Sequence, residues 1–195
     1  MKEKKREHYY LKAKHENYRS RAAYKLQQLQ DKFQVLGEGM SCLDLGAAPG
    51  GWLQVEALIA GPGGRVFGID ISSIRPVEGV TVMRGDVTSP DVVDKLIRMT
   101  GGPVDVILSD MSPDISGNYS LDHARSVDLV RTALVVAGRM LRDGGNFVAK
   151  LFDGELTGTL LADVRELFQS ARLSKPEASR KQSSEVYIVA KGFRK

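Results

Sequence analysis

The sequence has little cysteine, no long apolar run and no apolar N-terminus. Its single cysteine, Cys42, cannot by itself form an internal disulfide or a zinc site, which favours a reducing compartment. Cys42 stands in an apolar stretch and is predicted to fill the core. No apolar run approaches the roughly 20 residues of a membrane helix, and the charged N-terminus is unlike a secretory signal. These absences predict a cytoplasmic protein without a membrane segment.

Charge is distributed unevenly along the 195 residues, although the net charge is only +4. Residues 1–25 hold nine Lys/Arg against three Asp/Glu, and residues 172–195 hold seven against two. The residues between them hold twelve against nineteen. Solvated chain ends would explain this pattern, and so would contact with a polyanion such as RNA. We predict a basic arm over 1–19 and a single domain over 20–195.

Apolar strands alternate with helices along the rest of the chain. A helix is predicted from an N-cap at Ser20 to a stop at Gly37 and Gly39. The other predicted helices cover 50–60, 90–99, 121–141 and 156–170, and the predicted strands cover 41–46, 64–70, 80–84, 104–109, 145–151 and 185–191. This alternation predicts an α/β domain with a doubly wound, parallel sheet.

The segment DLGAAPGGW, residues 44–52, lies where the first strand meets the next helix. Glycines such as Gly46 and Gly50 let the backbone approach a ligand closely. Ala48 and Pro49 break the dinucleotide pattern GxGxxG, and the P-loop's GK[ST] is absent. A tight turn without a ligand is the alternative explanation.

Two aspartates follow the next two strands. Asp70 ends the second strand about 20 residues after the glycine turn, where a carboxylate can accept both hydroxyls of a ribose. Asp86, after the third strand, could accept a hydrogen bond from an adenine amino group. Together with the glycine turn they predict an adenosine pocket at the carboxyl edge of the sheet.

Four more ionisable residues stand at strand ends, within an apolar strand or near a helix start: Lys25, Asp110, Lys150 and Glu185. Lys150 interrupts the apolar run FVAKLF, where an unpaired lysine is rare. With the segments SRAAYKL, DLGAAPGGW, SDMSP, VAKLF and SSEVYIV, they make the chain resemble the FtsJ/RrmJ family of RNA ribose 2′-O-methyltransferases from Ser20 to Lys191.

The resemblance implies a Rossmann-like methyltransferase fold, with a seven-stranded, mostly parallel sheet whose last strand is antiparallel. It implies a catalytic tetrad of Lys25, Asp110, Lys150 and Glu185. It also implies that S-adenosyl-L-methionine is held by Gly50, Trp52, Asp70, Asp86 and Asp110, to which the glycine turn adds Gly46. The family's usual MAP-like triplet is Met111-Ser112-Pro113 here.

The chemistry of a ribose hydroxyl explains the need for a lysine. The hydroxyl is a poor nucleophile, so its proton must leave as its oxygen attacks the methyl group. Burial and a second cation lower a lysine pKa, while neighbouring carboxylates raise it. Lys150 could therefore act as the base, or as a cation that only orients the hydroxyl. Asp110 and Glu185 would hold the two ammonium groups.

RNA is the predicted partner of the two basic ends, through Lys12, Lys14, Arg19, Arg21, Arg180 and Lys181. The resemblance implies methylation of a uridine in 23S rRNA within the large subunit by a monomeric enzyme. A tRNA anticodon-loop methyltransferase, a catalytically silent ribosome assembly factor and a nicotinamide oxidoreductase remain as alternatives. The histidines, including His123, show no metal spacing and are assigned to the surface or to RNA. Asn118 and Tyr119 are assigned to substrate contact or to a flexible lid.

Overall fold

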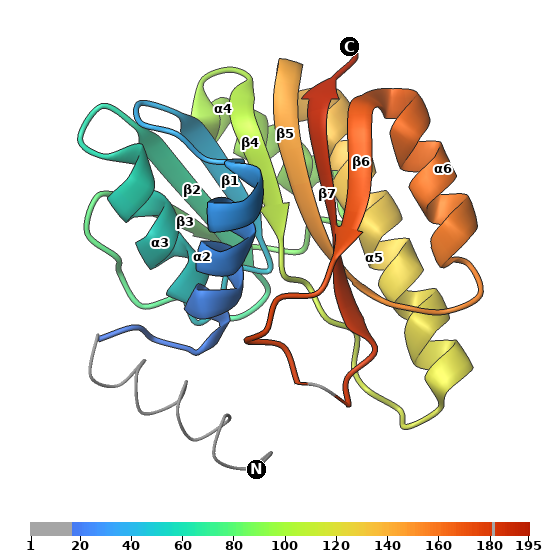
Figure 1. The fold of residues 1–195 in the computed structure, drawn as a ribbon. Coiled ribbons are helices and arrows are strands. Elements are labelled where there is room, and N and C mark those ends of the chain that lie inside the picture. The colour runs from blue at the N-terminus through green and yellow to red at the C-terminus, as the bar shows by residue number, and fades with distance from the viewer. Residues whose placement is uncertain (1–16, 181) are drawn as a thin grey trace.

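A seven-stranded sheet forms the centre of the molecule in a computed structural model that describes residues 17–180 and 182–195 (Figure 1). The strand order is β3-β2-β1-β4-β5-β7-β6. The strands are β1 (Ser41–Leu45), β2 (Arg65–Asp70), β3 (Val80–Arg84), β4 (Val104–Ser109), β5 (Leu141–Phe152), β6 (Phe168–Ser174) and β7 (Glu185–Phe193).

Strand directions match the predicted doubly wound methyltransferase topology. β3, β2, β1, β4 and β5 pair in parallel, and β7 is antiparallel to both β5 and β6. The predicted seven strands and the antiparallel last strand are therefore confirmed. The chain winds outward from β1 to β3 and then returns to β4 on the other side of β1. The carboxyl ends of β1 and β4 thus form the switch point, where α/β sheets bind ligands.

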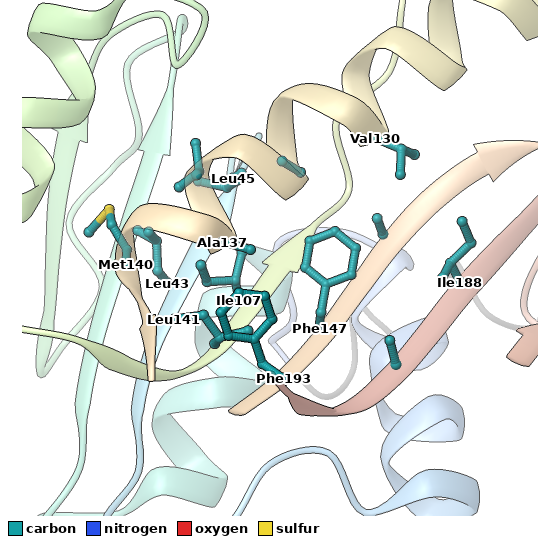
Figure 2. Packing of buried hydrophobic residues seen from close by; sticks show 14 of the residues in the cluster. Leu43, Leu45, Ile107, Val130, Ala137, Met140, Leu141, Phe147, Ile188 and Phe193 are labelled. Atoms are coloured by element: carbon teal, nitrogen blue, oxygen red, sulfur yellow. The ribbon is translucent and has the colours of Figure 1, made fainter. Parts of the chain in front are cut away.

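Helices cover both faces of the sheet, as Figure 1 shows. One layer contains α2 (Ala22–Phe33) and α3 (Gly51–Ala60); the other contains α4 (Pro90–Thr100), α5 (Tyr119–Met140) and α6 (Thr157–Leu167). Successive strand side chains point to opposite faces, so buried Cys42 packs in the layer of α2 and α3. Leu43 packs instead with Ile107, Phe147 and Ala137 in the other layer (Figure 2). Among the described helices, none combines the length and hydropathy of a membrane span.

Several predicted element boundaries are wrong, including the start of β5, which lies at Leu141 and not at residue 145. Arg21, not Ser20, is the N-cap of α2, and no side chain caps it. The helix ends at Phe33 rather than near Gly37, because Gln34 adopts the left-handed conformation and its N–H bonds to the Gln30 carbonyl. The predicted helix 156–170 ends at Leu167, and the edge strand β6 follows directly. Its buried Phe168 and Ala171 are three residues apart, a spacing that also suits a helix.

His123 is buried, which corrects its assignment to the surface or to RNA. Its ring lies between α5 and the loop that follows β5. Nδ1 is 2.6 Å from the Phe152 carbonyl oxygen, and Nε2 accepts a hydrogen bond from the Leu156 N–H at 3.0 Å. One ring nitrogen donates and the other accepts, as in a neutral imidazole. His123 therefore fixes the connection from β5 to α6.

The SGNY loop before α5 makes specific hydrogen bonds. Asp122 accepts hydrogen bonds from the N–H and hydroxyl groups of Ser116. Asn118 caps α5 by accepting from the Leu121 N–H, and the Tyr119 hydroxyl donates to the Asp153 carbonyl. These contacts hold the loop against α5 and the chain after β5, although the Tyr119 side chain stays exposed.

Candidate active site

A cavity of about 210 Å³ opens at the switch point between β1 and β4. The glycine turn after β1, the start of α2 and the residue after β4 form its walls. Of the predicted site residues, Lys25, Gly46, Trp52 and Asp110 line it, together with Arg21. The structure therefore joins part of the predicted catalytic set with part of the predicted cofactor set.

Lys150 and Asp110 form the first of two largely buried ion pairs beside this cavity. The Lys150 ammonium lies 3.3 Å from Asp110 Oδ1 and donates to the Asp110 backbone carbonyl at 2.6 Å. β5 pairs with β4, so Lys150 on β5 lies beside Asp110, the residue that follows β4, at the same edge of the sheet. The side chain of Lys150 is only 9% exposed, so these contacts compensate a charge that is largely removed from water.

Lys25 and Glu185 form the second ion pair, with Nζ and Oε1 2.7 Å apart. Glu185 also accepts a hydrogen bond from the Ser179 hydroxyl. Burial alone would raise the pKa of Glu185, but Lys25 and the Ser179 hydroxyl hold it below its ordinary value. Lys25 is buried, so it is not the exposed helix lysine that its local sequence would suggest.

Tyr187 connects the two ion pairs and was missed by the sequence reasoning. Its fully buried hydroxyl donates to Asp110 Oδ1 at 2.9 Å and lies 3.4 Å from Glu185 Oε1. Tyr187 stands opposite Lys150 in the pairing of β5 with β7. Burial, then Asp110 and Glu185, raises its pKa well above the ordinary value, so the hydroxyl keeps its proton. The sequence carried one signal for Tyr187. It stands two residues after Glu185 on the same strand, so both side chains point to the same face of the sheet.

The glycine turn is fastened to the ends of β2 and β4. The N–H groups of Gly46 and Ala47 bond to the Ile69 carbonyl, and the Ala48 N–H bonds to Asp70 Oδ2 at 3.0 Å. Gly46 has φ +76°, and a Cβ there would lie 2.9 Å from the Met111 backbone. Only glycine allows this close approach of the turn to the chain after β4.

The next residues pack the turn against α2. A Cβ on Gly51 would lie 2.4 Å from the Ser20 hydroxyl oxygen. The Trp52 indole N–H donates to the Ala22 carbonyl at 2.8 Å, and its ring packs on Tyr187 with centroids 5.8 Å apart. Trp52 therefore lines the cavity while holding the helix that carries Lys25.

The two other predicted cofactor aspartates are held by local backbone. Asp70 ends β2, and its two carboxylate oxygens accept from the N–H groups of Ala48 and Ser72. Asp86 is exposed and lies two residues beyond the end of β3. Its Oδ1 accepts from the N–H and hydroxyl of Thr88, which lowers its pKa. Each carboxylate has lone pairs beyond those that accept these hydrogen bonds.

The predicted RNA contacts fall into three groups. Lys12, Lys14 and Lys181 lie outside the described residues, as do His8 and His15. Arg21 lines the cavity, and Arg180 is exposed in the loop before β7. Arg19 is engaged elsewhere: its guanidinium donates to the carbonyls of Pro49, Arg75 and Pro76. Arg19 therefore joins the start of the domain to the glycine turn and to the loop after β2.

A buried pair of acidic residues also escaped the sequence reasoning. Asp44 on β1 lines the cavity, and Glu56 on α3 lies behind it; both are 0% exposed. Burial raises the pKa of Asp44 well above its ordinary value and that of Glu56 to about 8. No local pattern marks such a pair, because the two residues meet only when α3 packs on the sheet.

The model of the FtsJ-like methyltransferase family matches residues 18–193. The chain belongs to this family. Its match to the family covers every catalytic and cofactor residue that was predicted, and the family name assigns the chain to the methyltransferases. The resemblance drawn from the sequence motifs is thereby confirmed.

Similar proteins agree with this family. Ribosomal RNA large subunit methyltransferase E of Archaeoglobus fulgidus is 48% identical over 189 residues, 97% of each chain. The enzyme of the same name from Halobacterium salinarum is 51% identical over 189 residues, 95% of this chain and 73% of the relative. A crystal structure of a Plasmodium falciparum protein, described as a ribosomal RNA methyltransferase, superposes with a TM-score of 0.81 at 30% identity, covering 90% of this chain and 98% of that one.

Proposed function

We propose that this methyltransferase uses S-adenosyl-L-methionine to methylate the 2′-hydroxyl of a uridine ribose in 23S large-subunit ribosomal RNA. The supporting observation is that Tyr187 joins two largely buried Lys–carboxylate pairs beside a glycine-walled cavity. The names of the relatives support the rRNA substrate. We place the enzyme in the cytoplasm and expect it to act as a monomer.

The cavity suits a cationic nucleoside cofactor. Gly46 keeps the turn close to Met111 because it has no Cβ, and the buried Asp44 and the half-buried Asp110 line the cavity with carboxylates. Asp70 would accept the ribose hydroxyls of the cofactor, and Asp86 its adenine amino group. Gly50 and Trp52 would support the turn. When bound, S-adenosylmethionine supplies an electrophilic methyl group.

Lys150 would hold the target hydroxyl and receive its proton. Its nitrogen is anchored by two oxygens of Asp110, so in the neutral amine the lone pair would remain for the ribose hydroxyl. Lys25, paired with Glu185, would fix the other side of the ribose. The neutral amine of Lys150 would accept the proton of the hydroxyl as the ribose oxygen is methylated, and would become an ammonium held by Asp110. Positioning of the hydroxyl in line with the methyl group supplies much of the rate.

Labelled methyl transfer to different RNAs tests the substrate. We expect label in free 23S rRNA or in assembled large subunits, and no more than background in tRNA. Mapping would then place the methyl group on one uridine. Label confined to tRNA would replace the proposal with the anticodon-loop alternative. RNA binding without any transfer, at saturating cofactor, would favour the assembly factor.

Removing the hydroxyl of Tyr187 should slow the reaction. Tyr187→Phe takes away the hydrogen bond that orients Asp110, so we expect kcat to fall about tenfold, a loss of about 1.4 kcal/mol. Loss of a buried bond to a charged group should also cost about 1.5–3 kcal/mol of unfolding free energy. Single-turnover kinetics and urea unfolding measure the two effects. In Tyr119→Phe, which loses the hydroxyl that bonds to Asp153, the rate should not change; an equal loss there would contradict the role of Tyr187.

Removing residues 1–16 should weaken RNA binding without changing the affinity for the cofactor. This truncation keeps Asn17 and Arg19, which bond to α3 through Gln54. RNA affinity should fall, and the slope of its logarithm against salt concentration should decrease by about 0.7–0.9 for each lost phosphate contact. Filter binding over a salt series and a cofactor titration measure both properties. Unchanged RNA affinity would exclude the arm as an RNA contact.

A further inference from the structure

Asp44 and Glu56 are two buried carboxyl groups that face each other. Both residues are 0% exposed, and among the described residues no donor reaches any of their four oxygens. Each side chain lies within hydrogen-bonding reach of the other. Two carboxylates cannot share this space without a proton between them, because like charges in a medium of low dielectric repel strongly.

The surroundings of the pair provide little positive charge. Asp70 at the end of β2 and Asp110 after β4 add to the negative potential at Asp44. Cys42, on the same strand, is buried and neutral, and burial followed by Glu56 raises its pKa. Across the cavity, Arg21 and Lys25 line the wall, and the Lys25 ammonium is paired with Glu185. Without a cation beside Asp44, these surroundings therefore favour a pair that keeps a shared proton.

We propose that Glu56 is a positioning residue that shares one proton with Asp44, and that a cationic group bound at Asp44 expels this proton. Glu56 does not line the cavity, whereas Asp44 does. When the cation binds, the shared proton passes to solvent and both carboxyl groups ionise, with the cation compensating the charge of Asp44. Binding of the cofactor is then linked to pH. This inference rests on the proposed use of S-adenosylmethionine.

Replacement of Glu56 by glutamine separates this linkage from a purely structural role. The Gln amide has the shape of the protonated acid and donates a permanent hydrogen bond to Asp44. It thus stabilises the ionised form of Asp44 before any ligand binds. Glu56→Gln should bind the cofactor but release no proton. Glu38→Gln, at an exposed position on the loop before β1, is the matched control.

Calorimetric titration in two buffers with different ionisation enthalpies counts the protons. At pH 7 we expect wild type and Glu38→Gln to release about one proton per bound S-adenosylmethionine, and Glu56→Gln close to none. S-adenosylhomocysteine lacks the sulfonium but keeps the ammonium. Proton release with both ligands would indicate that the ammonium binds at Asp44. Proton release with S-adenosylmethionine alone would indicate that the sulfonium binds there.

The possible failures are distinguishable. If neither ligand binds to the wild-type protein, the proposed cofactor is wrong. If S-adenosylmethionine binds without proton release, or if Glu56→Gln releases as much as wild type, the linkage is wrong and the cofactor stands. If Glu56→Gln does not fold, the wild-type proton count still decides.

Urea unfolding of the protein without ligand gives a second measure. The folded pKa of Glu56, about 8, exceeds its ordinary value of 4.5, so the folded state binds more protons than the unfolded state in this range. Wild-type stability should fall as pH rises from 5 to 8. In Glu56→Gln this decline should be smaller, and an equal decline in both proteins would also contradict the proposal.

Discussion

Replacing Lys150 with alanine is expected to lower kcat about 100- to 10,000-fold, the range typical of a lost proton acceptor. Lys150, on β5, has the least exposed side chain of the tetrad. Its nitrogen contacts the backbone carbonyl and the carboxylate of Asp110. Lys150 does not line the cavity, so cofactor affinity should change by less than about threefold, which is below 1.4 kcal/mol. Single-turnover methyl transfer and a cofactor titration measure the two quantities separately.

Lys191→Ala is the matched control for this variant. Lys191 lies on the adjacent strand β7, and its ammonium also donates to backbone carbonyls, those of Phe33 and Gln34. Its removal should affect stability without affecting turnover. If Lys150→Ala kept more than about a tenth of wild-type kcat, the activation free energy would have risen by less than about 1.4 kcal/mol. That result would contradict the assigned role.

Gly46→Ala should disrupt both the fold and the cofactor site. The substitution forces a side chain into the left-handed region, which costs about 1–2 kcal/mol. Its Cβ would also press on the backbone and side chain of Met111, and such overpacking costs about 1–3 kcal/mol. Relief of the clash with Met111 would move the turn away from the neighbouring Asp110, which lines the cavity. Cofactor affinity should therefore fall by at least about tenfold, or 1.4 kcal/mol.

Gly39→Ala isolates the effect of the clash. Gly39 has φ +75°, close to that of Gly46, but its Cβ would have no neighbour within 4 Å. This control should lose only the conformational cost of about 1–2 kcal/mol and bind the cofactor normally. Urea unfolding and a cofactor titration compare the two variants. Equal losses in both would show that the close approach of the turn to Met111 has no role.

The parts of the site that the sequence predicted are those encoded by local motifs. Gly46 and Asp70 were found because a strand, a turn and a helix follow one another in a fixed order. Lys150 was found because a lysine inside an apolar strand needs a partner. The strand order then brings Asp110 and Glu185 to that lysine, so the tetrad follows once the topology is known.

The parts that escaped prediction depend on contacts between distant segments. Tyr187 and Glu56 look like ordinary members of a strand and a helix until the sheet places them beside Asp110 and Asp44. His123 was placed on the surface because the loop that covers it, residues 152–156, lies about 30 residues further along the chain. The start of strand β6 was merged with the preceding helix, since no glycine or proline occurs between Gly158 and Pro176.

The position of the transferred methyl group tests the central claim most directly. Large-subunit rRNA is incubated with the enzyme and S-adenosylmethionine that carries a deuterated methyl group, then digested to nucleosides and analysed by mass spectrometry. The proposed role of Lys25, Asp110, Lys150 and Glu185 predicts the label on the ribose, as 2′-O-methyluridine, and its loss in Lys150→Ala. Label on a nucleobase, or label that persists in that variant, would contradict ribose methylation by this tetrad.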